Sequence, residues 1–267
     1  MTGSTPKRTA LIWMLALAGL VLAGLMASML GRSAPATQAA IGDQLRPDLV
    51  TLPPSGLSIS NAKRKTKDLR FAYSAENRGA GVLELTWKSE DCDGDGVVSN
   101  DRTATQRIYK DFNGDGYFTR GTDTAYDTQK VGCFVFHPKH HHWHLENFAR
   151  YELRDLTGAL VGTTDKVSFC ITDSVRTKPQ LDGSPTSKYF ATCSRDGDQG
   201  LSIGWTDTYG AQLEGQAITL DSSAAGTFCL VEAADPLNHI AESNDSNNVT
   251  GIQVTISGTT ATPGGSC

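Results

Sequence analysis

Short segments of alternating apolar and polar residues, separated by turns, run along most of this 267-residue chain. Such alternation places every second side chain on one face, as in β-strands with one buried and one solvated side. The 27 glycines against 10 prolines also favour a loop-rich β protein over a helical bundle. We therefore expect a mainly β fold, an antiparallel β-sandwich-like single domain with long loops. The expected strands are 57–60, 69–73, 82–87, 148–153, 167–172, 216–220, 227–231 and 252–256.

The first 45 residues differ from the rest of the chain. Residues 1–9 carry Lys7 and Arg8, and an uninterrupted apolar stretch follows at 10–30. A basic flank before an apolar core predicts a signal peptide, while roughly 20 apolar residues are also long enough for an uncleaved membrane anchor. In both cases we expect a cytoplasmic basic region at 1–9, a hydrophobic helix that engages the membrane, and a linker at 31–45. The remainder would then be extracellular or held at the cell surface.

The charge of the chain limits its partners. It has 24 basic against 29 acidic residues, and residues 1–36 contain no acid, so the exported part is more acidic than the whole. An acidic domain is a poor binder of phosphate backbones, and we expect no nucleic-acid partner. Cationic amines, basic protein surfaces and calcium remain compatible with it.

Six cysteines are present, and none of them forms a C-x-x-C pair. An even number in an exported chain predicts three disulfides rather than a thiolate metal site, with the pairing left open. The cysteines are Cys92, Cys133, Cys170, Cys193, Cys229 and Cys267.

An acidic insert at 91–127 contains two D-x-[DN]-x-D-G motifs. Alternate side-chain oxygens on a tight loop, with glycine at the sixth position, can wrap a calcium ion. The twelfth position, which should be a bidentate Glu, is Arg102 in the first motif and Thr122 in the second. Asp101 and Asp123, one residue away, could replace it, and the alternative is a solvated acidic loop. The candidate ligands are Asp91, Asp93 and Asp95, then Asp111, Asn113 and Asp115.

Five of the six histidines lie in the segment HPKHHHWH at 137–144. Along a strand, residues two apart share a face, so His140, His142 and His144 are expected to project together. Three imidazoles can hold copper or zinc and leave positions open for water or dioxygen. His141 and Trp143 would point the other way, and His137 would lie outside the first set of ligands. A surface histidine tract is the alternative interpretation.

At these residues the chain resembles the catalytic domain of lysyl oxidases, which are copper- and quinone-dependent amine oxidases. That family has an H-x-x-H-x-H-x-H copper motif followed by a Y-[DE]-L strand, as at 137–144 and 151–153 here. Its K-x-S-F-C segment matches 166–170, and its Q-G-[LI]-x-x-G-x-x-D-x-Y segment matches 199–209. Shorter matches extend the resemblance over about residues 44–257. This places a catalytic domain at 46–258 and a flexible tail at 259–267.

The resemblance implies copper bound by His140, His142 and His144, and a lysyl tyrosylquinone cofactor formed by joining Lys166 to Tyr209. The implied reaction oxidises primary amines or peptidyl lysine to aldehydes with dioxygen, releasing hydrogen peroxide and ammonia. By position, it also implies the disulfide pairs Cys170–Cys193, Cys92–Cys133 and Cys229–Cys267.

Some residues depart from the family, and other functions stay open. Arg150 stands where animal enzymes have a histidine that is a candidate base, and Asp207 is another candidate because it could share the face of Tyr209. A second hypothesis is a non-catalytic copper-binding β-sandwich protein of the cell envelope, which would need neither Lys166 nor Tyr209. A third is a metal-dependent hydrolase with Glu146 as its base.

Overall fold

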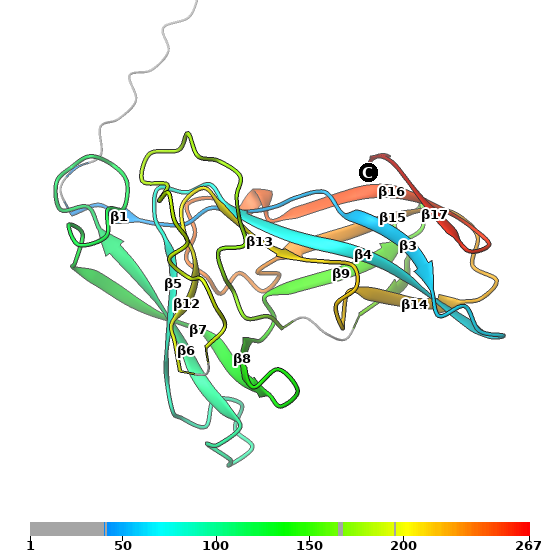
Figure 1. The fold of residues 1–267 in the computed structure, drawn as a ribbon, viewed down its shortest axis with the longest axis horizontal. Coiled ribbons are helices and arrows are strands. Elements are labelled where there is room, and N and C mark those ends of the chain that lie inside the picture. Colours follow the sequence, from blue (N-terminus) through cyan, green and yellow to red (C-terminus); the bar gives the residue numbers. More distant parts are fainter. Residues whose placement is uncertain (1–39, 41, 165–167, 195) are drawn as a thin grey trace, which may run out of the picture. The chain divides into compact units, whose positions relative to one another are not determined.

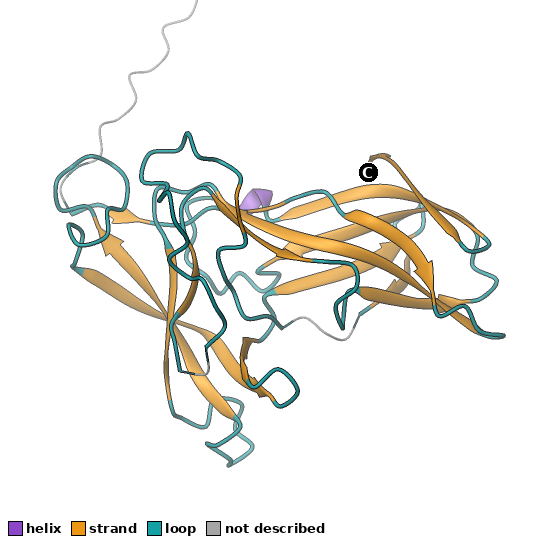
Figure 2. Cartoon of the chain, in the orientation of Figure 1, coloured by secondary structure: helices purple, strands orange, loops and turns teal. Residues whose placement is uncertain are grey.

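Antiparallel strands make up nearly all the regular structure of this computed structural model, which describes residues 40, 42–164, 168–194 and 196–267. All of these residues fall within one unit, Ala39–Cys267. Among them, seventeen strands pair into three sheets, and the one helical element is a 3₁₀ turn, Asp245–Asn247 (Figures 1 and 2). The expectation of a mainly β, antiparallel protein is confirmed.

The first sheet is built around the long strand β4, whose side chains alternate between the core and the surface. Its order is β11-β13-β4-β14, and β2 and β3 also pair with β4. The strands are β2 (Leu49–Thr51), β3 (Ser55–Ser60), β4 (Thr66–Asn77), β11 (Val175–Arg176), β13 (Trp205–Tyr209) and β14 (Ala217–Asp221).

The second sheet has the order β10-β9-β15-β16-β17. Its strands are β9 (Ala149–Arg154), β10 (Leu160–Thr163), β15 (Gly226–Ala234), β16 (Val249–Ser257) and β17 (Thr260–Ser266). It packs against the first sheet, with β17 beside β3 (Figure 1). Strand β10 also contacts β14. Leu69, Phe71 and Tyr73 of β4 are fully buried, and the Phe71 ring centroid lies 5.1 Å from that of Tyr151 on β9. Each such side chain stabilises the fold by roughly 1.5–3 kcal/mol.

The third sheet carries the histidine segment. Its order is β12-β5-β6-β7-β8, with β1 also paired to β6. The strands are β1 (Gln44–Leu45), β5 (Leu83–Lys88), β6 (Asp101–Lys110), β7 (Tyr126–His137), β8 (His142–Leu145) and β12 (Gln199–Leu201). Strand β6 lies wholly within the expected acidic insert at 91–127, so that segment contributes a central strand as well as loops.

Three expectations need correction or lie outside the description. The tail expected to be flexible instead forms β17, which pairs with β16. Segment 167–172 forms no strand within its described residues, where Phe169 makes an isolated bridge to Leu145. The hydrophobic segment at 10–30 and most of the linker lie outside the described residues. No helix within the described residues is long and apolar enough to cross a membrane.

Three disulfides join the cysteines as Cys92–Cys133, Cys170–Cys193 and Cys229–Cys267. These are the pairs that the family resemblance implies. The last pair ties the C-terminal residue to β15, which helps to explain why the tail is ordered. Three disulfides fit a protein exported to an oxidising compartment.

Candidate metal and tyrosine site

A tight hairpin between β7 and β8 presents the histidines. His137 ends β7 and pairs in register with His142, the first residue of β8. Between them, the backbone N–H groups of His140 and His141 donate to the carbonyl of His137 at 3.1 and 2.9 Å. His141 has φ of +58°, a left-handed conformation that reverses the chain direction. His140 therefore lies in the turn and not on the strand, which corrects the expectation of one continuous strand.

Strand alternation accounts for the other two histidines. His142 and His144 lie two residues apart on β8 and share a face. Trp143 between them is buried, with its ring centroid 5.2 Å from that of Phe136. This burial fixes which face of the short strand carries the imidazoles.

The three imidazoles converge at one point. Nε2 of His144 lies 3.0 Å from Nε2 of His142 and 3.4 Å from Nδ1 of His140. The His137 ring stacks on His140 at a centroid distance of 3.9 Å and on His144 at 4.8 Å. His137 thus backs the cluster, in agreement with its expected place outside the ligand set.

This donor set fits a transition metal. Two imidazole nitrogens about 2.0 Å from one ion are roughly 2.8–3.5 Å apart at bond angles of about 90–120°. The observed separations of 3.0 and 3.4 Å match that spacing. A ring nitrogen carries at most one proton, so three nitrogens meeting here cannot all be well paired with one another. A metal cation that accepts a lone pair from each of the three nitrogens fits this arrangement.

Tyr209 reaches the same region from the first sheet. Strand β13 carries Asp207 and Tyr209 on one face. The Tyr209 ring lies over Phe169, with centroids 3.9 Å apart. Phe169 is itself held to the end of β8, because it exchanges two backbone hydrogen bonds with Leu145 at 2.7 and 3.1 Å. That bridge brings the tyrosine beside the histidine hairpin.

The hydroxyl of Tyr209 has two close oxygen neighbours. It lies 2.7 Å from Oδ2 of Asp207 and 2.7 Å from the carbonyl oxygen of Cys170. One hydroxyl carries one proton, so both contacts are hydrogen bonds only when Asp207 is protonated and donates to Tyr209. Burial raises the pKa of Asp207 to about 7, which puts that state within reach near neutral pH. Desolvation and the charge of Asp207 raise the pKa of Tyr209 above its usual value.

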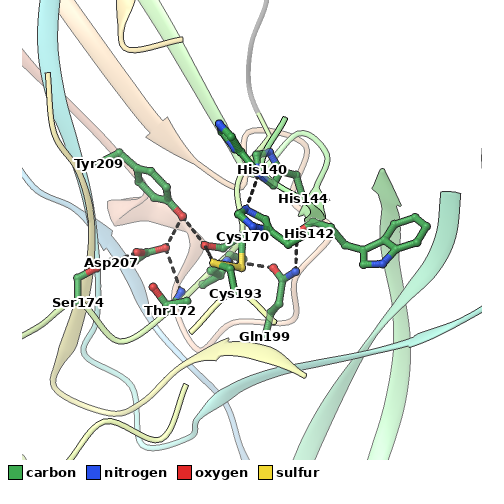
Figure 3. Close-up of a disulfide and its surroundings, with 12 residues drawn as sticks. His140, His142, His144, Cys170, Thr172, Ser174, Cys193, Gln199, Asp207 and Tyr209 are labelled. Carbon is green, nitrogen blue, oxygen red and sulfur yellow. Dashed lines mark hydrogen bonds between the residues drawn. A yellow bond between two sulfur atoms is a disulfide. The ribbon is translucent and has the colours of Figure 1, made fainter. Parts of the chain in front are cut away.

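A cavity of about 230 Å³ joins the two halves of the site. Its lining residues are His140, His142, His144, Phe169, Cys170, Cys193, Tyr209, Leu213 and Glu214. Figure 3 shows the Cys170–Cys193 disulfide between the histidines and the Tyr209–Asp207 pair. Gln199 braces this arrangement, since its amide donates to the carbonyl of Trp143 at 2.7 Å and accepts from the N–H of Ile171 at 3.0 Å.

Other residues singled out from the sequence have different surroundings. Lys166 lies outside the described residues. Glu146, the candidate hydrolytic base, is not grouped with the histidines among the described residues. Burial and then the charges of Asp93 and Asp101 raise its pKa, so it faces the acidic loop instead. Arg150 is half-exposed and pairs with Glu152 at 3.2 Å.

The structure adds Glu214 to the candidate site. Its side chain lines the cavity, and its carboxylate lies 3.3 Å from Nζ of Lys139 in an exposed ion pair. No sequence pattern marks Glu214, because a single acid in a turn has no spacing to recognise.

The two acidic motifs are placed differently. Ligand oxygens of Asp91, Asp93 and Asp95 lie within 4.8 Å of one another. The acids of the second motif, Asp111 and Asp115, are in no such group among the residues that the structure describes.

The family model and the relatives that match this chain all point to the same protein family. A family model described as lysyl oxidase matches residues 98–264, well over half of the chain. Lysyl oxidase homolog 4 of Mus musculus is 30% identical over 117 residues, 43% of this chain and 14% of that protein. Lysyl oxidase homolog 2 of Homo sapiens is 30% identical over 118 residues, 44% of this chain and 14% of that protein. The same homolog of Gallus gallus is 31% identical over 118 residues, with the same coverage.

The chain therefore matches only a small part of the length of these relatives. The family match nevertheless contains the histidine hairpin, the Cys170–Cys193 disulfide and Tyr209. This chain belongs to the lysyl oxidase family.

Proposed function

We propose that this chain is an exported, copper-dependent oxidase of primary amines, including peptidyl lysine. The reaction converts an amine, dioxygen and water to an aldehyde, hydrogen peroxide and ammonia. The observation that carries the proposal is the shared cavity: three converging imidazoles and the Tyr209 ring line the same 230 Å³ space. A protein that only binds copper needs no tyrosine there.

In this proposal His140, His142 and His144 hold copper, and Lys166 is joined to Tyr209 as a lysyl tyrosylquinone. Copper and the quinone would supply the oxidising power, which no ordinary side chain has. The protein's own groups position the Tyr209 ring and exchange a proton with it. Phe169 and the Cys170 carbonyl hold the Tyr209 ring, and Asp207 exchanges a proton with the Tyr209 hydroxyl.

The assignment of Lys166 rests on the family resemblance. It precedes Phe169 by three residues in the K-x-S-F-C segment. Joining its amine to the ring requires the neutral form of lysine, which an apolar setting favours because burial disfavours the charge.

The substrate would enter as a cation. Glu214 places a carboxylate on the cavity wall, and the described surface otherwise offers apolar Leu213 and Phe169 beside the histidines. A carboxylate at the entrance attracts an ammonium group, while the apolar wall suits an alkyl chain. A lysine side chain combines both features.

The decisive experiment is peptide mapping of the full chain produced with copper under oxidising conditions. We expect a joined Lys166–Tyr209 peptide that reacts with phenylhydrazine, together with peroxide release when a primary amine is added. Tyr209→Phe should abolish the joined peptide and the activity. Tyr189→Phe is the matched control, because Tyr189 is exposed and lies outside the cavity.

Folded protein that binds copper but keeps both peptides separate would overturn the proposal. It would instead favour the non-catalytic copper-binding protein.

A further inference from the structure

The Cys170–Cys193 disulfide lies against the histidine cluster. Both cysteines line the cavity that the three imidazoles share, and Figure 3 shows His142 beside the two sulfur atoms. A ring nitrogen of His142 and the sulfurs of Cys170 and Cys193 all lie within 4.8 Å of one another. Among the residues that the structure describes, this disulfide alone has a histidine nitrogen within such reach of both sulfurs.

Opening the disulfide turns these three residues into a second set of metal ligands. Metals bind the thiolate form of cysteine, which a closed disulfide does not provide. Reduction by an external dithiol transfers two electrons and two protons to the sulfurs, and the reductant becomes a disulfide. A metal ion that then binds both sulfurs displaces the two thiol protons.

The backbone around the disulfide suits such a site. Two thiolate sulfurs bound to one ion at about 2.3 Å lie roughly 4 Å apart at a bond angle of about 120°. The Cα atoms of Cys170 and Cys193 are 5.9 Å apart, and each sulfur hangs on a rotatable Cα–Cβ bond. Rotation of the two side chains therefore separates the sulfurs towards that distance. Cys193 also lies in the irregular segment 191–194, which adapts more easily than a strand.

The site can be reached from one side. Cys170 is 4% exposed, whereas Cys193 is half-buried between the exposed residues Thr192 and Ser194. An external thiol or a copper donor can approach along the Cys193 segment, while Cys170 stays in the cavity wall.

The ligand set favours copper in its reduced state. Two thiolates are soft ligands, and one imidazole completes a three-ligand set that Cu(I) accepts. Zinc ordinarily takes four ligands. The three histidines, in contrast, offer nitrogen alone.

We propose that the reduced chain holds Cu(I) between Cys170, Cys193 and His142, and that copper enters the histidine site through this position. The proposal rests on the proposed copper function, since the histidine set is the destination. His142 belongs to both ligand sets. When the thiolates pass two electrons to an external disulfide, the protein disulfide closes and an external thiolate pair is released. Both sulfur ligands are then lost, and the ion stays at His142 beside His140 and His144.

Anaerobic competition with the Cu(I) chelator bicinchoninate tests this site in the full chain, reduced and then freed of reductant. Five proteins are compared: wild type, Cys170→Ser with Cys193→Ser, Cys229→Ser with Cys267→Ser, His142→Gln and His144→Gln. The Cys229–Cys267 pair is the matched control, because it also closes a disulfide but lies in no metal-binding group among the described residues. All five proteins are reduced, so none differs from the others by an intact disulfide.

The affinity for the most tightly bound Cu(I) should separate these proteins into two groups. Removing a group that only supports a metal ligand costs roughly 10–100-fold in affinity, so removing a ligand should cost at least about tenfold. We expect that loss in the Cys170/Cys193 variant and in His142→Gln. The Cys229/Cys267 variant and His144→Gln should match wild type.

Equal affinity in all five proteins, or equal losses in the two double cysteine variants, would overturn the site. Wild-type affinity in His142→Gln would overturn the shared ligand and with it the route of entry. X-ray absorption of the reduced wild type decides the question even if a variant fails to fold. We expect two sulfur ligands and one nitrogen ligand, and copper bound by sulfur alone would contradict the proposal.

Failure of the proposed amine oxidation gives a different result. It appears in the oxidised chain, as Lys166 and Tyr209 peptides that stay separate. Binding of Cu(I) by the reduced chain involves neither residue, so that result leaves the Cu(I) site standing.

Discussion

Replacing Asp207 by asparagine separates proton transfer at Tyr209 from the support of its ring. Asparagine has the shape of the protonated carboxyl group. Its oxygen can accept from the N–H of Thr172, as Oδ2 does at 3.3 Å, and its amide can donate to Ser174, whose hydroxyl now donates to Oδ1 at 3.2 Å. In that orientation the substitution keeps the contacts to Thr172 and Ser174, and its oxygen can still accept from the Tyr209 hydroxyl, but the side chain can no longer take up a proton.

The proposed conversion of Tyr209 to a quinone requires its hydroxyl proton to leave. Ionised Asp207, 2.7 Å away, is the acceptor that the geometry offers. Because the pKa of Asp207 is raised to about 7, the rate of conversion should rise with pH through a midpoint near 7. General base catalysis of this kind contributes about 10²–10⁴-fold, so we expect a loss of about that size and no midpoint in Asp207→Asn.

The free energy of unfolding should fall as pH rises, whereas the rate of Tyr209 conversion should increase. In the folded protein Asp207 keeps its proton up to about pH 7, whereas its ordinary value is 3.8. Its neutral form is fully stabilising below the unfolded pKa, and that stability is lost as pH rises through the folded pKa. At about 1.4 kcal/mol per pH unit, the loss is at most about 4 kcal/mol by pH 7. The Asp207→Asn variant should not show this pH-dependent loss of stability.

Two assays decide the matter. Mass spectrometry follows the joined peptide over time from pH 5.5 to 8.5 after copper is added, and urea denaturation gives the free energy of unfolding at each pH. Ser174→Ala is the control, because it loses a contact to Asp207 but keeps the carboxylate. If Asp207→Asn converts Tyr209 at the wild-type rate with the wild-type pH profile, the proton-acceptor role is wrong.

Three further changes test other parts of the site and core. Glu232→Gln should raise the free energy of unfolding at pH 8 but not at pH 4, because burial raises the pKa of Glu232 to about 9 and wild-type stability falls as pH rises towards it; a wild-type urea midpoint that does not change with pH would contradict this. Replacing Cys170 and Cys193 together by serine should cost about 3 kcal/mol in denaturant unfolding, since the bond closes a loop with a sequence separation of 23 residues; an unchanged midpoint would exclude a stabilising role. Glu214→Gln should raise KM for cationic amines several-fold with a smaller effect on kcat, measured by peroxide release; a lower kcat at unchanged KM would argue against substrate attraction.

The sandwich was predictable because its strands alternate visibly. In β4 the residues Leu69, Phe71 and Tyr73 are fully buried, and the intervening residues are less buried. The same periodicity marks 148–153 and 252–256, which overlap β9 and β16. A two-residue period of apolar side chains is a local property, so a single sequence reveals it.

Strand β6 lacked that signal because much of its buried side is polar. Thr103 and Gln106 are buried, and Gln106 is satisfied by the backbone of Ala241, which it contacts at 2.8 and 3.0 Å. A polar side chain that is buried because a distant backbone pairs with it looks like a solvated residue in the sequence. Segment 101–110 therefore shows no strand signal of its own within the acidic insert.

In the candidate site, too, contacts within one strand could be predicted from the sequence, while contacts between distant segments could not. The alternation of β8 predicts that His142 and His144 share a face, but nothing local predicts that Tyr209 meets them. That contact depends on Phe169, which exchanges two backbone hydrogen bonds with Leu145 and whose ring centroid lies 3.9 Å from that of Tyr209. A bridge of one residue pair has no periodicity, so only the order of motifs in a known family could suggest it. If the bridge is what joins the two halves, Phe169→Ala should lower conversion of Tyr209 while leaving copper binding by the hairpin intact.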